Sequence, residues 1–412
     1  MYPAFVAWNT WLVLVMFYAY QLILRITPNV VMQQIMDNFK VDADMVGNFA
    51  GIYYVGYVLM HIPLAIILDH YSPRKVITAC IASTVIGFMP LIYSDNWMLI
   101  TVGRFISGMG AAGAALGAFK MLRVCFGEER FPKMLGYMVS IGLLGAMFGS
   151  GPVTYFISIF GWTNTLNFMV YFGIVLCIYS FFSIPKLSSN EDGLSIKVIL
   201  GDLKLIATNK YLWILSIMGG FMIGPMEGFA DAWSNQYLKS VYEFNDETAG
   251  SATQMIYLGM AVGLVSLGYL FEKFKTYYGL ILLSAFGMGL AMTLVIFGIG
   301  NLILLKFLFF VIGFFCGYQL IVIAKAATFA SEKHATLTST VANMIMMSFG
   351  YVFHRSMGKV MLYTCDIDLK GVITYTKSSY NYAMSTIVIG LVIGMVICVF
   401  LMYFDRKSKK IA

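Results

Sequence analysis

Residues 11–24 read WLVLVMFYAYQLIL, a run without a charged side chain that ends directly before Arg25. Similar runs recur along the 412-residue chain, which is 60% hydrophobic and only 11% charged. A soluble domain carries about 25% charged residues, so this composition indicates a membrane protein. Backbone groups in lipid must be bonded internally, and long unbroken apolar runs favour helices over the alternating strands of a barrel.

The length accommodates about twelve helices of roughly 20 residues each. The predicted spans cover residues 8–33, 45–68, 75–93, 98–122, 133–158, 165–184, 211–239, 249–271, 276–299, 302–328, 337–363 and 381–404. The first run has no basic region before it and no small-residue cleavage site, so we expect it to remain as the first helix. The fold class predicted is an all-α membrane protein.

The longest polar segment lies between the sixth and seventh spans and divides the chain into two halves. We predict an N-terminal six-helix bundle at 1–185, a cytoplasmic linker at 186–210 and a C-terminal six-helix bundle at 211–412. Part of the linker, SIKVILGDLKLI, has the apolar spacing of a helix that lies on a membrane surface. Both halves have a charged turn after their second span, as parallel repeats of one bundle would.

Basic residues are distributed unevenly between the two sides of the membrane that these spans define. One side holds Arg74, Lys75, Arg123, Arg130, Lys133, Lys186, Lys197, Lys204, Lys210, Lys273, Lys275, Lys333 and the tail DRKSKK; the other holds Lys40, Lys239, Lys370 and Lys377. By the positive-inside rule, both termini are expected in the cytoplasm. We expect a multi-pass protein of a bacterial inner membrane.

Several functional classes receive no support from the sequence. The six cysteines are scattered without a CxxC pair, and the four histidines are not clustered, so no metal site or other cofactor is expected. A nucleotide-binding GxxxxGK[ST] motif, an HExxH motif and a basic, aromatic-rich patch for nucleic acid are all missing from the sequence. The chain is therefore not expected to be an enzyme. A sensor that binds without transporting remains a minor alternative.

Two motifs carry a family resemblance. ILDHYSPRKV (67–76) resembles the loop after the second span in the major facilitator superfamily, with Asp69, Arg74 and Lys75 matching, while Ala65, His70 and Ser72 depart from the pattern. GRFISGMGAA (103–112) is similar to the fourth-span pattern of that family, with Arg104 matching. The resemblance implies two pseudo-symmetric six-helix bundles, and the chain looks most similar to bacterial nutrient permeases of the sugar-phosphate or phagosomal amino-acid transporter type.

The resemblance also implies roles for particular residues. Asp69, Arg74 and Lys75 would form a cytoplasmic gate that holds one transport state. Arg104 matches an arginine tied to proton coupling in the family, although a structural role is an equal alternative. Spans 1, 4, 7 and 10 line the central cavity in such transporters, and most of the ionisable residues within spans fall on those helices.

Ionisable residues inside spans are costly in lipid and mark functional sites. Arg25 offers a bidentate fork to a carboxylate or phosphate. Glu227 and Asp231, at i and i+4 in the stretch GPMEGFADAW (224–233), share one face of a regular helix. Because two such carboxylates repel, one of them is suited to carry a proton. The alternative for these residues is a static ion pair.

The remaining candidates for substrate binding lie on other spans. They are Lys120, Lys325, His354, Arg355 and Trp233, the two lysines having interface anchoring as an alternative. We expect a monomeric secondary transporter in the lipid bilayer that couples protons to uptake of a small polar metabolite with a carboxylate, such as an amino acid. The alternatives are an organic-anion or sugar-phosphate exchanger and an exporter of drugs or siderophore-like anions.

Overall fold

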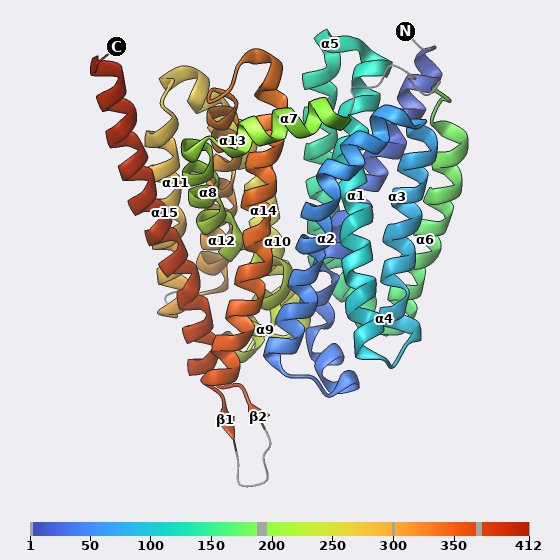
Figure 1. Cartoon of the computed structure of the whole chain (residues 1–412). Coiled ribbons are helices and arrows are strands. Elements are labelled where there is room, and N and C mark those ends of the chain that lie inside the picture. The colour runs from blue at the N-terminus through green and yellow to red at the C-terminus, as the bar shows by residue number, and fades with distance from the viewer. Residues whose placement is uncertain (1–2, 188–195, 299–300, 368–372, 412) are drawn as a thin grey trace. The chain divides into compact units, whose positions relative to one another are not determined.

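The chain folds almost entirely into long helices, as the apolar runs predict (Figure 1). The structure, a computed structural model, describes residues 3–187, 196–298, 301–367 and 373–411. Within these residues, eleven helices are long and apolar enough to cross a membrane. The predicted span at 337–363 lies in a twelfth long helix, α14, which carries His354, Arg355 and Lys359 and is more polar than the other eleven.

The helices group into two compact units. Unit 1 comprises Met1–Phe39 and Ile52–Ile196, and unit 2 comprises Lys40–Gly51 and Lys197–Ala412. The boundary falls within one helix, α2, whose first turns group with unit 2. Of the predicted linker at 186–210, residues 188–195 lie outside the described residues, and most of the rest forms the helix α7.

The bounds of the elements follow the predicted spans closely. Those whose residues lie mainly in unit 1 are α1 (Ala4–Phe39), α2 (Ala43–His70), α3 (Pro73–Phe88), α4 (Pro90–Tyr93), α5 (Trp97–Phe160) and α6 (Trp162–Ser183). The helix α5 contains two predicted spans and breaks at Gly127, where φ is +75°. Such a backbone angle favours glycine, which explains how the chain turns back at this position.

Unit 2 contains the remaining elements. They are α7 (Ile196–Ala207), α8 (Lys210–Gly228), the π-helical turn η1 (Phe229–Trp233), α9 (Ser234–Tyr242), α10 (Asp246–Phe274), α11 (Tyr277–Ile296), α12 (Leu302–Cys316), α13 (Tyr318–Ala327), α14 (Glu332–Tyr363), β1 (Asp366–Ile367), β2 (Ile373–Thr374) and α15 (Lys377–Ile411). The strands β1 and β2 pair antiparallel in a small hairpin that the all-helical prediction did not include. Figure 1 shows this hairpin and the end of α15 at opposite ends of unit 2.

Large apolar side chains point outward along the helices, as a lipid-facing surface requires. On α6 the side chains of Phe168, Tyr171 and Phe182 are at least 60% exposed, and on α11 Phe286 and Leu290 are more than half exposed. A soluble monomer rarely exposes apolar patches of this extent. The exposed apolar faces are therefore suited to contact with the lipid of a bilayer.

Glycines allow α10 to pack closely against α12 and α13 in unit 2. A Cβ atom added at Gly259 or Gly263 would overlap with backbone carbonyls of α12, and one added at Gly313 would overlap with the Ile256 carbonyl of α10. Small residues at such contacts let helix backbones approach, which replaces the hydrophobic driving force that lipid removes.

We expect Gly263→Ala to destabilise the protein, because the added methyl group meets the α12 backbone. Overpacking of this kind costs about 1–3 kcal/mol, which should lower the melting temperature of the detergent-purified protein. Gly268→Ala is the matched control on the same helix, since an added Cβ there has nothing within 4 Å. This control should gain helix propensity and melt no lower than the wild type; equal losses for both variants would contradict the packing assignment.

Candidate functional site

The buried guanidinium of Arg104 is bound to the backbone of α1 in unit 1. Its Nη1 donates to the Leu24 carbonyl at 2.8 Å and its Nη2 donates to the Arg25 carbonyl. Pro28 lies four residues after Leu24 and has no N–H, so the helix itself cannot bond that carbonyl. Arg104 therefore bonds to an acceptor that Pro28 leaves without a helical partner, and it holds α1 in the turn before Pro28.

Arg25 itself lies one turn before Pro28, beside two aromatic rings of α2. Its guanidinium carbon is 5.7 Å from the centroid of the Tyr54 ring, and the guanidinium of Arg104 is 4.8 Å from that of Tyr53. The Tyr53 hydroxyl donates to Gln21 of α1 at 2.8 Å. The faces of aromatic rings attract cations, so this arrangement supports two guanidinium groups in a largely apolar interior.

The two acidic side chains of the seventh predicted span are buried in unit 2. Glu227 is 7% exposed and lies next to the end of α8, whereas Asp231 is 2% exposed and lies within η1. In η1 the backbone N–H of Ser234 bonds to the carbonyl of Phe229, five residues earlier. This π-helical turn differs from the regular helix on which the sequence prediction of a shared face was based, and such turns are frequent at functional sites.

A tyrosine that the sequence analysis did not select contacts this turn. The hydroxyl of Tyr257 on α10 lies 2.9 Å from Oδ1 of Asp231 and 3.0 Å from the carbonyl oxygen of Ala230. One turn earlier on α10, Thr253 bonds to Ser234 at 3.0 Å and to Asn235 at 2.8 Å. A signal was present in the sequence, because Thr253 and Tyr257 are polar residues at i and i+4 on a largely apolar span.

Trp233 and His354 meet at the contact between η1 and α14. The indole nitrogen of the fully buried Trp233 donates to the His354 carbonyl at 3.4 Å, and the His354 Nδ1 lies 2.7 Å from the Gly350 carbonyl. A Cβ at Gly228 would lie in contact with the backbone nitrogen of His354. In this conformation the Trp233 side chain packs between helices and is closed to solvent.

Arg355, the next residue of α14, binds the beginning of α2. Its Nε donates to Oδ1 of Asp44 at 3.3 Å, and its Nη1 donates to the Tyr351 hydroxyl at 3.2 Å. The Tyr351 hydroxyl in turn donates to the Asn48 side chain at 3.0 Å. These contacts lie within unit 2, to which the first turns of α2 belong, and they hold those turns against α14.

The predicted gate residues of unit 1 have partners other than one another. Lys120 of α5 pairs with Asp69 at 3.2 Å and also bonds to the Leu68 carbonyl at the end of α2. Arg74 donates to the Ile184 carbonyl at the end of α6. Lys75 is exposed to solvent. Lys120, predicted as a substrate ligand, is thus joined to the predicted gate in this conformation.

Lys325, the candidate on the tenth predicted span, is held at the end of unit 2. Its ammonium group pairs with Asp405 of α15 at 3.2 Å, and it lies 5.1–5.5 Å from the ring centroids of Tyr277, Tyr278 and Phe329. The side chain is only 9% exposed. Lys325 therefore joins the ends of α11, α13 and α15.

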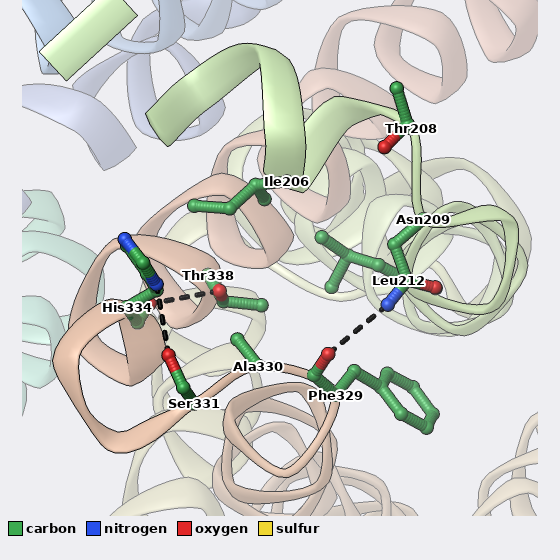
Figure 2. Close-up of a pocket in the computed structure, with 9 residues that line it drawn as sticks. All are labelled: Ile206, Thr208, Asn209, Leu212, Phe329, Ala330, Ser331, His334 and Thr338. Carbon is green, nitrogen blue, oxygen red and sulfur yellow. Dashed lines mark hydrogen bonds between the residues drawn. The ribbon is translucent and has the colours of Figure 1, made fainter. Parts of the chain in front are cut away.

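A separate cavity of about 510 Å³ lies beside α7 in unit 2. Figure 2 shows the residues that line it, which are Ile206, Thr208, Asn209, Leu212, Phe329, Ala330, Ser331, His334 and Thr338. The Asn209 amide donates to the Phe329 carbonyl at 3.2 Å, and His334 lies 3.1 Å from Asp202 of α7. The predicted substrate residues are elsewhere, so this cavity is a contact region between α7 and the α13–α14 connection.

Two further features bear on the chemistry. In the described residues, no three His, Cys, Asp or Glu side chains gather as metal ligands would. The two units instead place charges of opposite sign near the helix breaks: Arg25 in unit 1, and Glu227 and Asp231 in unit 2. Such groups can bind charged groups of a solute, and the two carboxyl groups can also take up or release protons.

A family model described as the Major Facilitator Superfamily matches residues 10–353. The chain belongs to this superfamily. It is therefore a multi-pass membrane protein of a superfamily of transporters rather than of enzymes. The resemblance that the two sequence motifs carried is confirmed.

Similar proteins support the same assignment. An uncharacterized MFS-type transporter of Caenorhabditis elegans is 26% identical over 402 residues, covering 91% of this chain and 65% of that protein. The MFS-type transporter pigP of Monascus ruber is 28% identical over 156 residues, covering 32% of this chain and 27% of that protein. The chain spans less than two thirds of the length of both relatives.

Solved structures share the fold. A bacterial homolog of the human lysosomal transporter Spinster, inward-facing and unoccupied, matches with a TM-score of 0.75 and 17% identity over 97% of this chain and 98% of its own. The nucleoside transporter NupG matches with a TM-score of 0.75 and 15% identity over 97% of this chain and 99% of its own. At these identities the likeness establishes the two-bundle fold.

The role of Arg104 at the α1 kink can be tested with Arg104→Gln and Pro28→Ala. Arg104→Gln should lower the melting temperature, because it leaves the Leu24 carbonyl buried without a strong donor, at a cost of about 1–3 kcal/mol. Pro28→Ala restores the N–H that can bond this carbonyl within the helix. In the Pro28→Ala background, Arg104→Gln should therefore cost about 1 kcal/mol less. Equal costs in the two backgrounds would mean that Arg104 acts independently of the proline.

Proposed function

We propose that the protein is a proton-coupled transporter that takes up a small polar metabolite bearing a carboxylate, an amino acid or similar zwitterion, by alternating access. The observation that carries the proposal is the set of opposite charges at the helix breaks, an arginine beside the kink of α1 and two buried carboxylates at the end of α8 and in η1. A zwitterion carries both complementary charges. A phosphorylated substrate would instead meet carboxylates in unit 2.

In this proposal, Arg25 binds the substrate carboxylate. A guanidinium matches a carboxylate with two parallel hydrogen bonds, and in an apolar interior such bonds are stronger than in water. Arg25 lies one turn before Pro28 of α1, with its guanidinium 5.7 Å from the centroid of the Tyr54 ring. Lys120, Lys325 and Arg355 instead tie helix ends together through ion pairs with Asp69, Asp405 and Asp44. The position of Arg25 inside the first predicted span supports it as the substrate anchor.

In the same proposal, Glu227 and Asp231 bind the substrate ammonium group and carry the transported proton. Two buried carboxylates four residues apart repel each other when both are ionised, which favours the uptake of a proton by one of them. Binding a proton and a zwitterion together then adds one positive charge, which couples uptake to a pH gradient. Arg104 fixes the α1 backbone on which Arg25 lies, so its proposed part in coupling is indirect.

The setting of the protein is also part of the proposal. Basic residues concentrate in the connections that we assign to the cytoplasm, which supports cytoplasmic termini. We propose a monomer in a bacterial inner membrane. Asp69, Arg74, Lys75 and Lys120 then lie on the cytoplasmic side, where their contacts tie together helix ends that must move during transport.

Ligand binding can be measured by thermal shift with amino acids, dipeptides, organic acids, nucleosides and sugar phosphates. A compound that binds the folded state raises the melting temperature by mass action. We expect zwitterions with a free carboxylate to give the shift, and Arg25→Ala to abolish it, whereas Arg130→Ala, at an exposed position of α5, retains it. A sugar phosphate as the only hit, or an unchanged shift in Arg25→Ala, would reject this assignment.

Coupling can be measured in proteoliposomes with the compound found in that screen. Glu227→Gln should reduce accumulation driven by an imposed pH gradient at least about tenfold, since one carboxylate cannot provide the repulsion that drives proton uptake. Exchange at equal pH should continue. Glu247→Gln, at an exposed position of α10, is the control and should accumulate normally. Persistent pH-driven accumulation in Glu227→Gln would remove this residue from coupling.

A further inference from the structure

A half-exposed tryptophan lies at the start of α1, supported by two other aromatic rings. The ring centroid of Trp8 is 5.5 Å from that of Trp11 and 5.6 Å from that of Phe126 on α5, both in edge-to-face contact. Phe126 is buried, whereas Trp8 is 53% exposed. Because aromatic pairs of this kind have a preferred geometry, the exposed part of the Trp8 indole is held in a defined orientation on the surface of unit 1.

A hydrogen bond places a cation of α5 beside this end of α1. The indole nitrogen of Trp11 donates to the Met134 carbonyl at 3.2 Å, in the part of α5 that follows the break at Gly127. The residue before Met134 is Lys133, which is exposed and whose ammonium group lies 5.8 Å from the ring centroid of Tyr137. Tyr137 is itself 49% exposed. An exposed cation and two exposed aromatic side chains therefore lie where α1 meets this part of α5.

Trp8 and Lys133 both lie at the ends of their spans. Trp8 is the first residue of the first predicted span and Lys133 is the first residue of the fifth, and the apolar helical segments that contain them are Ala4–Phe39 and Lys133–Phe160. Tryptophan and tyrosine are enriched at the headgroup level of a bilayer, and basic residues near the ends of spans attract anionic lipids there. We therefore expect these side chains to lie at the depth of the lipid phosphates.

The charged groups near Lys133 do not neutralise it. Arg123 pairs with Glu128 at 3.3 Å, so this acid already has a cation as its partner. Glu129 and Arg130 are exposed neighbours of opposite charge. Among the described residues, no acidic group pairs with the Lys133 ammonium, whose partner is the Tyr137 ring. The positive charge of Lys133 can therefore attract an anion from outside the protein.

We propose that Trp8, Lys133 and Tyr137 bind one anionic phospholipid. The lipid phosphate lies on the Lys133 ammonium group, and the glycerol and the upper acyl chain lie against the rings of Trp8 and Tyr137. Phosphatidylglycerol has the net negative charge that this site requires, whereas the positive headgroup of phosphatidylcholine cancels the charge of its phosphate. A lipid bound here joins the start of α1, the helix that carries Arg25, to α5.

A similar cation in unit 2 provides a matched control. The ammonium group of the exposed Lys273 lies 5.6 Å from the ring centroid of Phe274, which is 58% exposed. In the part of the chain that the structure describes, no other aromatic ring supports Phe274 in the way that Trp11 and Phe126 support Trp8. Lys273 therefore offers the same charge beside an exposed ring, without an oriented indole.

Native mass spectrometry of the detergent-purified full-length protein tests the site, with phosphatidylglycerol and phosphatidylcholine of equal acyl chains as probes. One phosphatidylglycerol should bind more tightly than any phosphatidylcholine. Lys133→Gln should weaken this binding about fivefold, the usual effect of one interfacial cation, while Lys133→Arg and Lys273→Gln retain it. Equal binding of the two lipids, or equal losses in Lys133→Gln and Lys273→Gln, would overturn the proposal, because either result indicates unspecific attraction.

The part of Trp8 is tested with Trp8→Leu, alone and combined with Lys133→Gln. Each single variant should lose the one tightly bound phosphatidylglycerol, and the double variant should lose no second one, since both side chains contact the same lipid. Loss of two lipids in the double variant, or normal binding in Trp8→Leu, would reject the shared site. The melting temperature without added lipid serves as the control for folding, and Lys133→Gln should leave it unchanged because Lys133 is exposed.

Discussion

Lipid provides no hydrogen bonds, so each interruption of a membrane helix must be completed by the protein itself. The chain meets this constraint in the same way in both units. In unit 1, Pro28 has no N–H to donate to the Leu24 carbonyl, and Arg104 of α5 donates to this carbonyl in its place. In unit 2, α8 passes into a π-helical turn, and Tyr257 of α10 reaches a carbonyl of that turn. A side chain from another helix completes the backbone each time.

The charges that we propose as functional lie close to these interruptions. Arg25 is three residues before Pro28, and Glu227 is two residues after Pro225. A residue next to a break has backbone that departs from a straight helix, so its side chain can be aimed away from the regular helical surface. Arg104 and Tyr257 bind the backbone of the same segments that carry these charges, so substitutions at Arg104 and Tyr257 should affect both stability and the proposed transport.

Sequence reasoning predicted the helical spans well, because they depend on the local cost of placing polar groups in lipid. It did not predict the partners of the intramembrane charges. Lys120 and Arg355 were expected to face a substrate, and the structure pairs them with Asp69 and Asp44, whose positions depend on packing between distant segments. The π-helical turn could not be predicted either, since the i, i+4 rule assumes a regular α-helix. The stretch GFADAW contains no residue type that requires the wider turn of a π-helix.

The partners found for the cations narrow the chemistry of the substrate. A phosphate ester carries two negative charges, and the cations Arg104, Lys120, Lys325 and Arg355 are each bound to backbone or carboxylate oxygens of the protein. Lys325 and Arg104 are the most buried of these, and separating a buried charge from its acceptors leaves both groups uncompensated, which costs several kcal/mol. A carboxylate needs a single guanidinium, and a substrate ammonium group matches the carboxylates of unit 2. This cost is the physical reason for proposing a zwitterion rather than a dianion as the substrate.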